Sequence, residues 1–546
     1  MSDAISIGIS AIIAAQAGIN TTGNNIANSS THGYSRLKVI QNQSVIAGSG
    51  TQVTDIIRVY DDFLETQKMD AQSAYSQLQA QNAQLQKINS MLSNSSAGIA
   101  ANMQSFFSSL QAISVSPNDT TSRQSFLSNA DTLASSFNDA QTVIDGINKD
   151  VNTQINNSVN NINNIAKQIA ALNSSIFNAQ QSASPSTANP LQDSRALLLA
   201  DLSKIIQVKV IAEGNTTNIF IGNSQPLVLG TKFNQLDTTP SSTNTNNTEA
   251  CFNINGIKTP ISQNNLSGGT LTGLINFRNN TLPTVQNAIG RIALGLASNM
   301  NAINTEGFTL NVEKPTGGNL FKLPSINVTT NTANKGNATL EVTYGDISKI
   351  STSDFSLQKV ADGKYNLIRI SDNTLLTSGD VAAITTAAAV EGLNINLDLA
   401  EANITIGDQF TIRPTANVAG GLLLAISNVN DIAAAKTAGL VGDNSNILKM
   451  IALQTNKTLA NNSLSLTGAY SSMVGEIGSK SQALISTSTT ANAVLTQATS
   501  ALDSVAGVNL DEEATNLLKY QQAYQAAGKL IATSKAMFDV LFSIGA

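Results

Sequence analysis

The first helix that the sequence predicts carries its large apolar side chains on one narrow face. Between Asp3 and Asn28 these side chains recur at alternating steps of four and three residues, which is the spacing of a coiled-coil stripe. The positions are Ile5, Ile9, Ile12, Ile19 and Ile26, and Gln16 and Gly23 complete the register. The stripe predicts a partner helix, because most helical stability in proteins comes from packing an apolar face.

A candidate partner lies at the other end of the chain. Large side chains recur there every seven residues, with small or amide residues at most positions between them. The large residues are Leu510, Leu517, Tyr524, Ile531 and Phe538, and the intervening positions hold Ala514, Gln521, Gly528 and Phe542. An intramolecular core and a contact between subunits both fit these stripes. Their location at the two termini favours contact between subunits.

The inner ends of both terminal helices carry clear signals. Asn24, Asn25 and Asn28 belong to a type that tolerates left-handed backbone, so the first helix is expected to end there. An extended segment follows, with Tyr34 and Arg36 expected on opposite faces. This segment runs from Gly33 to Tyr60 through Val39, Ile40, Val45, Val53 and Ile56.

The last helix is expected to begin after Asn509, which is placed to cap it. Asp511, Glu512 and Glu513 occupy the first turn, where the helix dipole stabilises anions. We interpret these three acids as a helix terminus rather than as a catalytic carboxylate pair.

Between the two ends, helical and β patterns alternate along the chain. Helices are expected over 61–92, 106–113, 126–176, 197–206, 271–300, 447–459 and 470–502, and β structure is expected over 208–233 and 323–413. Polar linkers are expected at 182–189 and 238–248. The apolar stripe over 126–176 is too long to wrap round a compact core, so this part should be elongated.

These patterns predict a multidomain α+β protein. Its elongated helical bundle or coiled-coil stalk is formed by both chain ends and carries inserted β-rich outer domains. The expected units are residues 1–60 with 500–546 as a terminal coiled coil, 61–205 with 265–322 and 414–499 as an elongated helical domain, 206–264 as a small β-rich segment, and 323–413 as an inserted β-rich outer domain.

Composition excludes several functions. Of the 546 residues only 12% are charged, and the net charge of -6 offers no footprint for nucleic acid or an anionic membrane. The single histidine, His32, and the single cysteine, Cys251, exclude a His-based metal cluster, a Ser-His-Asp triad, an internal disulfide and, unless these two residues meet, a Cys-His dyad. We therefore predict no catalytic, metal-binding or cofactor-binding residues.

Neither a membrane span nor a cleaved signal peptide is expected. No run of about 18 apolar residues occurs. Ala15, Gln16 and Ala17 have the small-x-small form of a cleavage site, but Asp3 stands where a signal peptide needs a basic residue.

Several motifs together are similar to those of one family. Residues 24–28, then Thr31 and residues 33–36, resemble the signature of the bacterial flagellar axial proteins, which comprise rod, hook and hook-associated proteins. Residues 507–513, 520–526 and 536–539 are similar to the hook-associated members at the junction between hook and filament. Patches at 267–278, 302–308 and 407–414 agree with them. His32 stands where these proteins often have proline.

The resemblance implies a non-enzymatic structural subunit of the extracellular flagellum. Such a subunit is exported unfolded and assembles at the distal end of the hook, and its terminal helices form the inner tube. The implied partners are further copies of the chain, hook protein, a second junction protein, and an export chaperone that binds the C-terminal helix. A hook or distal rod protein of the same family is the first alternative, and a secreted adhesin that binds through residues 323–413 is the second.

The expected assembly interface combines both terminal stripes with the loop between residues 24 and 36. Its residues are Ile5, Ile9, Ile12, Ile19, Asn24, Asn25, Ile26, Asn28, Gly33, Tyr34, Arg36, Leu510, Leu517, Tyr524, Ile531 and Phe538.

Overall fold

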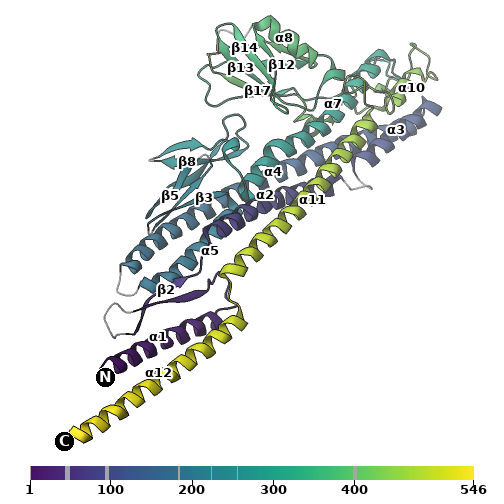
Figure 1. Cartoon of the computed structure of the whole chain (residues 1–546). Helices are drawn as coiled ribbons and strands as arrows, with labels where there is room; N and C mark the ends of the chain where they lie inside the picture. Colours follow the sequence, from purple (N-terminus) through teal and green to yellow (C-terminus); the bar gives the residue numbers. More distant parts are fainter. Residues whose placement is uncertain are drawn as a thin grey trace.

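Both ends of the chain lie together at one end of an elongated molecule (Figure 1). This computed structural model describes residues 2–43, 50–92, 98–181, 185–214, 216–222, 224–254, 256–397 and 403–545. Helices α1 (Ser2–Ala27) and α12 (Leu510–Gly545) run side by side there and form the terminal helix pair. The confirmed fold class is multidomain α+β. The elongated bundle itself is built from internal helices, and the chain ends form this separate pair.

A two-stranded hairpin joins the terminal helix pair to the bundle. Strand β1 (Leu37–Gln43) pairs antiparallel with β2 (Thr51–Arg58). The expected extended segment is therefore two strands, and Val45 lies outside the described residues.

The bundle is built around one very long helix. α4 (Thr120–Gln180) spans 61 residues, and Asp119 caps it by accepting a hydrogen bond from the Ser122 amide. Helix α4 therefore confirms the long helix that the apolar stripe over 126–176 predicts. The other helices are α2 (Asp62–Leu92), α3 (Ile99–Val115), α5 (Asn189–Ile205), α6 (Gly269–Asn276), α7 (Leu282–Glu306), α10 (Ser445–Ala452) and α11 (Leu466–Ala506). Phe106, Phe126 and Phe137 are fully buried in their shared core.

A small β lobe lies on α4. One sheet holds β3 (Val208–Glu213), β4 (Thr216–Ile221), β5 (Gln225–Leu229) and β6 (Lys232–Phe233), and the other holds β7 (Gln235–Pro240), β8 (Thr248–Ile254) and β9 (Ile257–Pro260). Asparagine side chains of α4 bond to backbone groups of this lobe. Asn163 bonds to Leu236, and the fully buried Asn173 donates to the carbonyls of Thr217 and Gly230.

The outer domain is more mixed than the sequence pattern suggests. Its five-stranded sheet has the order β11 (Asn327–Thr330), β17 (Gln409–Arg413), β13 (Phe355–Ala361), β14 (Lys364–Arg369) and β15 (Thr374–Gly379). β12 (Glu341–Tyr344) pairs with β16 (Leu393–Asn396), and at the domain's base β10 (Phe321–Lys322) pairs with β18 (Leu423–Leu424) next to α9 (Val418–Gly421). The unexpected element is helix α8 (Val381–Val390), whose Asp380 cap binds the Ala383 amide.

Three further details differ from the expectation. The helix expected over 447–459 ends at Ala452. Before α11 the chain makes a turn in which Ala460, Asn461 and Asn462 all have left-handed backbone, with φ of 53°, 56° and 59°. One turn of π-helix, Phe277–Thr281, interrupts the expected helix 271–300. The expected unit boundary at residue 500 falls inside α11, and the division into units stays a prediction.

Candidate functional site

Small residues form the contact between α1 and α12. Gly8, Ala15, Gly18, Thr22 and Asn25 are buried and follow one another at steps of seven, three, four and three along one face of α1. A Cβ atom added to Gly18 would lie 2.5 Å from Cδ1 of Tyr520, and one added to Gly8 would lie 2.5 Å from Cγ1 of Ile531. Because helix separation depends on the side chains at the contact, these residues let the two helices approach closely.

The expected isoleucine stripe is therefore displaced by one residue from the buried face. Ile9 is 48% exposed, and Ile5, Ile12, Ile19 and Ile26 are half-buried along the flank. Ile7 and Ile13 are also exposed. The expectation that the isoleucines pack directly on α12 is wrong, because glycine and alanine occupy the close contact.

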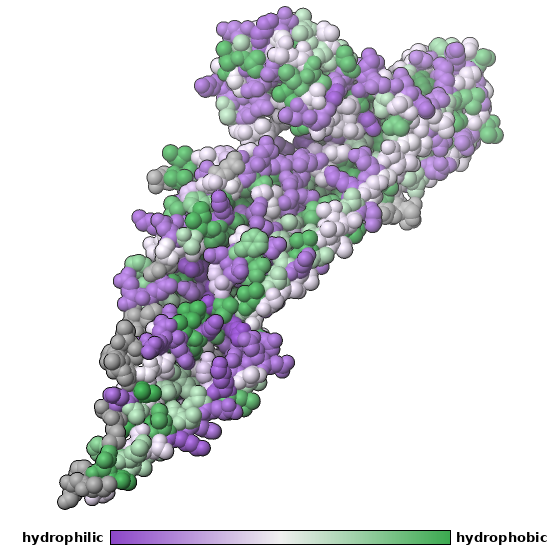
Figure 2. Space-filling view, in the orientation of Figure 1, coloured by the Kyte–Doolittle hydropathy of each residue, from purple (hydrophilic) through white to green (hydrophobic). Residues whose placement is uncertain are grey.

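On α12 the expected stripe is partly correct. Leu517 and Ile531 are half-buried, and Ile531 lies against Gly8 of α1, whereas Leu510, Tyr524 and Phe538 are exposed. The side chain of Phe542 lies outside the described residues. Figure 2 shows hydrophobic side chains over the terminal helix pair and hydrophilic ones where α11 meets α12.

A buried polar cluster closes the inner end of the terminal helix pair. Asn25, 1% exposed, lies at its centre and donates from Nδ2 to the Leu37 carbonyl and to Oε2 of Glu513, over 2.9 and 3.0 Å. Its Oδ1 accepts hydrogen bonds from the Tyr34 hydroxyl at 2.8 Å and the Leu37 amide at 2.9 Å. We call Asn25, Tyr34, Arg36, Glu512 and Glu513 the terminal cluster.

Arg36 completes the terminal cluster. Its Nε donates to Oε1 of Glu513 at 2.8 Å, and its two terminal nitrogens donate to Glu512 at 3.0 and 2.6 Å. Tyr34 and Arg36 therefore turn towards the same region. The expectation of opposite faces is wrong, because residues two apart in an extended segment point to the same side. Asn509 does cap α12, since its Oδ1 accepts from the Asp511 amide. Two of the three first-turn acids, Glu512 and Glu513, have the further role of binding Arg36.

The loop between α1 and β1 also packs against α5. Gly33 has a φ of +79°, and a Cβ there would lie 2.3 Å from Cδ2 of Leu197, so glycine meets both a backbone and a space requirement. Nearby, Arg58 binds Asp193 at 2.6 Å and the Ser35 hydroxyl at 2.9 Å. Asn24 is exposed, and Asn28 donates to the Asn24 carbonyl at the helix end. The loop thus connects the terminal helix pair to the bundle.

Burial and charge perturb the titration of this region. Burial, and secondarily the charges of Asp193 and Glu513, raise the pKa of Tyr34 to about 12. Burial raises the pKa of Asp193 although Arg58 opposes the shift. The hydrogen bond from Arg36 lowers the pKa of Glu512. At neutral pH the phenol is therefore a neutral donor, while Arg36 and Glu512 are charged.

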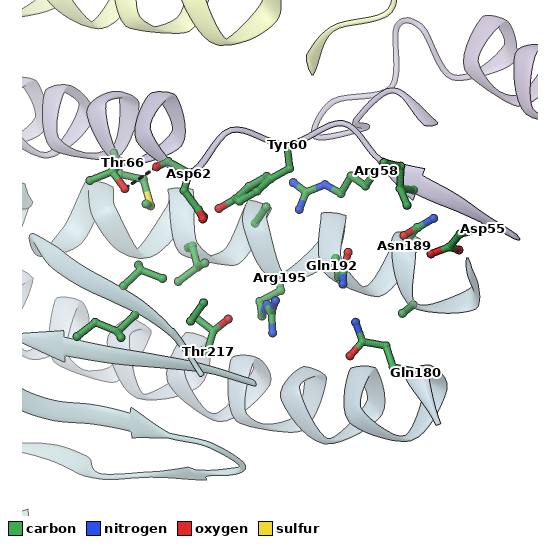
Figure 3. A pocket seen from close by; sticks show the side chains of 18 of the residues that line it. Asp55, Arg58, Tyr60, Asp62, Thr66, Gln180, Asn189, Gln192, Arg195 and Thr217 are labelled. Carbon is green, nitrogen blue, oxygen red and sulfur yellow. Dashed lines mark hydrogen bonds between the residues drawn. The ribbon is translucent and has the colours of Figure 1, made fainter. Parts of the chain in front are cut away.

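A cavity of about 670 Å³ lies beside this loop, between β2, α5 and the start of α2 (Figure 3). Arg58, Tyr60, Asp62, Gln192 and Arg195 are among its lining residues. Tyr60 lies under the Arg58 guanidinium at 4.5 Å, and burial raises its pKa to about 12. The lining residues include no histidine or cysteine, and hence no nucleophile beside an imidazole base.

Neither the single histidine nor the single cysteine belongs to the terminal cluster. His32 is exposed in the loop, and Cys251 is fully buried in β8, where burial raises the pKa of its thiol. Within the described ranges, no group of three or more His, Cys, Asp or Glu side chains is placed to hold a metal ion.

One property of α1 departs from expectation. Among the described residues, Asp3–Ala27 is a helix long and apolar enough to cross a membrane, judged by length and composition. Core helices and signal sequences meet the same criterion. The buried residues Thr21, Thr22 and Asn25 on this helix are polar, which suits packing against protein.

Comparison with known proteins gives matches along the whole chain. Models of four protein families match it: flagella basal body rod protein at residues 5–34, the flagellar hook-associated protein FlgK helical domain at 85–321, the flagellar hook-associated protein 1 D2-like domain at 329–414, and the flagellar basal body rod FlgEFG protein C-terminal at 501–544.

Relatives match over nearly the full length. Flagellar hook-associated protein 1 of Escherichia coli K12 is 32% identical over 556 residues, and that of Salmonella typhimurium LT2 is 32% identical over 574 residues, each with 100% of both chains covered. The solved structure of the flagellar hook junction protein FlgK from Burkholderia pseudomallei superposes with a TM-score of 0.74 at 25% identity, covering 81% of this chain and 100% of that chain.

Proposed function

The chain belongs to the flagellar hook-associated protein 1 family, and we propose that this structural subunit of the hook–filament junction assembles through its terminal helix pair. The observation that carries this proposal is the division of α1 into two faces. Small residues contact α12, and the flanking isoleucines remain available to other subunits. Burying that flank removes little hydration from charged groups, because residues 4–35 carry no Asp, Glu, Lys or Arg.

The proposed interface contains the expected residues in two roles. Ile5, Ile9, Ile12, Ile19, Ile26, Leu510, Tyr524 and Phe538 would contact neighbouring subunits in the inner tube, because each is exposed or half-buried in the single chain. Asn25, Tyr34, Arg36 and Gly33 instead support the shape of the subunit. Leu517 is half-buried, and Ile531 packs against α1.

Membership of the family supports a proposal for the assembly partners. We infer that copies of the chain form a ring or helical tube between hook protein and a second junction protein, outside the cell. The subunit would reach that place by export in an unfolded state. An export chaperone would cover the end of α12, where Met537, Phe538, Val540 and Leu541 are all more than half exposed.

The decisive experiment is deletion of the gene in its own host. We expect cells with intact hooks and no filaments, and filament subunits released into the medium. Disappearance of the hooks would instead support a hook or rod protein, an alternative motivated by the rod-protein models that match both ends. The adhesin alternative loses its basis, because residues 329–414 match a domain of hook-associated protein 1.

Limited proteolysis gives a second test. The terminal helix pair contacts the bundle mainly through the hairpin and the loop, so it should open locally at low cost. In the purified chain we expect trimming within about residues 1–60 and 500–546 before the bundle is cut. Termini as resistant as α4 would contradict low-cost local opening of the terminal helix pair.

A further inference from the structure

The chain bends between α11 and α12, and one residue, Arg36, binds both sides of the bend, with its backbone amide on α11 and its side chain on α12. Helix α11 ends at Ala506, and α12 begins at Leu510. The Arg36 amide donates to the Ala506 carbonyl at 3.0 Å. The Arg36 guanidinium binds Glu512 and Glu513 in the first turn of α12.

The local caps do not fix this bend. The Gly507 amide donates to the Asp503 carbonyl at 2.9 Å and so terminates α11, and Asn509 caps α12. Each cap acts within its own helix, and neither determines the direction of one helix relative to the other. Arg36 does connect them, because it contacts the last carbonyl of α11 and two carboxylates of α12.

The chemistry of the contact suits a rigid connection. An arginine presents a planar set of donors, and here that set binds two adjacent carboxylates. Glu513 is only 2% exposed, so removal of Arg36 would leave a buried carboxylate that the Asn25 side-chain amide alone could not neutralise. The second carboxylate, Glu512, is 53% exposed, and that half of the contact is open to salt and acid.

We propose that Arg36 is a positioning residue that fixes the orientation of α12 relative to α11 at the bend between them. It thereby sets the tilt of the terminal helix pair relative to the bundle. The inference deepens the proposed function, since this tilt would determine how the inner tube meets the outer layers. The bend itself is a property of the single chain, however, so it is tested independently of assembly.

The test is a distance measurement between two nitroxide labels in the purified full chain. The exposed residues Asn492 on α11 and Lys529 on α12 are replaced by labelled cysteines, while Cys251 is fully buried and stays in place. The distance distribution is measured by pulsed electron paramagnetic resonance. We expect one narrow peak for the parent chain, and loss of that single peak in Arg36→Ala.

Three further variants identify the cause. Lys38→Ala is the matched control, because it removes a second cation whose charge acts on Glu512 but whose side chain, among the described residues, makes no hydrogen bond to α11 or α12. It should keep the narrow peak. Arg36→Lys should broaden the peak, since an ammonium is a compact charge without the planar fork. Glu512→Gln removes the charge of the exposed carboxylate and should broaden the peak less than Arg36→Ala.

Two results would overturn the proposal. One is a parent chain that already shows a broad distribution, and the other is an Arg36→Ala variant with the parent's narrow peak. Hydrogen exchange on the same samples distinguishes a change in the bend from unfolding of the terminal helix pair. A variant that changes only the bend keeps the amide protection within α1 while the distance between the labels changes. If α1 protection is lost in Arg36→Ala, the test passes to Glu512→Gln. A broadened peak in that variant supports the proposal, and the parent's narrow peak overturns it. Failure of the gene-deletion test would not alter any of these distances.

Discussion

Substitution of Gly18 by alanine should open the terminal helix pair. The added Cβ would lie 2.5 Å from Cδ1 and 2.6 Å from Cγ of Tyr520, closer than a carbon contact allows. Either the ring rotates out of the contact or the helices separate. Gly23 on the same helix provides the matched control, because no atom lies within 4 Å of a Cβ placed there.

Two effects of opposite sign determine the outcome. Alanine favours a helix over glycine by about 1 kcal/mol, and both variants gain this term. Overpacking a close contact costs about 1–3 kcal/mol, and only Gly18→Ala pays it. The expected net change is a loss of about 1 kcal/mol for Gly18→Ala and a gain of about 1 kcal/mol for Gly23→Ala.

Hydrogen exchange of α1 amides in the full chain measures this local opening. Because a factor of ten corresponds to about 1.4 kcal/mol, exchange should be roughly fivefold faster in Gly18→Ala and roughly fivefold slower in Gly23→Ala. Equal shifts in one direction would refute the reasoning, since they would mean that Gly18 is not in a close helix contact.

Three other substitutions or conditions test separate parts of the structure. Asn173→Ala should lower the free energy of unfolding by about 2–3 kcal/mol in urea titrations, since the fully buried amide serves Thr217 and Gly230, whereas the exposed Asn160→Ala should change it by less than about 0.5 kcal/mol. Ala460→Gly should raise the thermal midpoint, because glycine adopts a φ of 53° without the roughly 1 kcal/mol that alanine loses there; a lower midpoint would contradict strain at this turn. Acid should loosen the α11–α12 bend: Arg36 lowers the pKa of Glu512, so the contribution is complete above the ordinary value of 4.5 and is lost as pH falls through the lower folded-state pKa. The label distance should then broaden below about pH 4.5 and should respond less to acid in Glu512→Gln.

Local patterns predicted the helices because their signals lie within a few residues of one another. The stripe over 126–176 is a direct consequence of 3.6 residues per turn, and it corresponds to α4 with a two- to three-turn extension. Helix α8 escaped prediction because its alanine- and threonine-rich sequence has little amphipathic contrast, and only residues such as Ile384 and Ala388 are buried. The cap at Asp380 was the available signal.

The register of the terminal helix pair was less accessible. A search for large apolar side chains selects isoleucine, but close helix approach selects the smallest residues. The glycine and alanine positions were present in the sequence at the same four- and three-residue steps, displaced by one. Reading small residues as a stripe in their own right would have located the contact with α12.

The terminal cluster could not be derived from periodicity. Asn25 and Glu513 are 488 residues apart, and no local pattern relates them. The family signature drew attention to Asn25, Tyr34 and Arg36, and the helix dipole gave a sufficient local reason for Glu513. The interaction with the helix dipole is sufficient to explain Glu513 from the sequence, so the sequence gives no reason to expect its second interaction, with Arg36 and Asn25.

The placement of charge supports the proposal that the subunit assembles through its terminal helix pair. Arg36 is the first charged residue after Asp3, and its guanidinium is neutralised by Glu512 and Glu513 inside the same subunit. A neighbouring subunit that covers the isoleucine flank therefore removes water from apolar and uncharged groups, which is favourable at about 25 cal/mol per Å² of apolar surface. Had Arg36 faced outward instead, each new contact would have had to dehydrate an ion. In the proposed assembly, Arg36 and its carboxylate partners thus hold the shape of the subunit, and the uncharged isoleucine flank would face its neighbours.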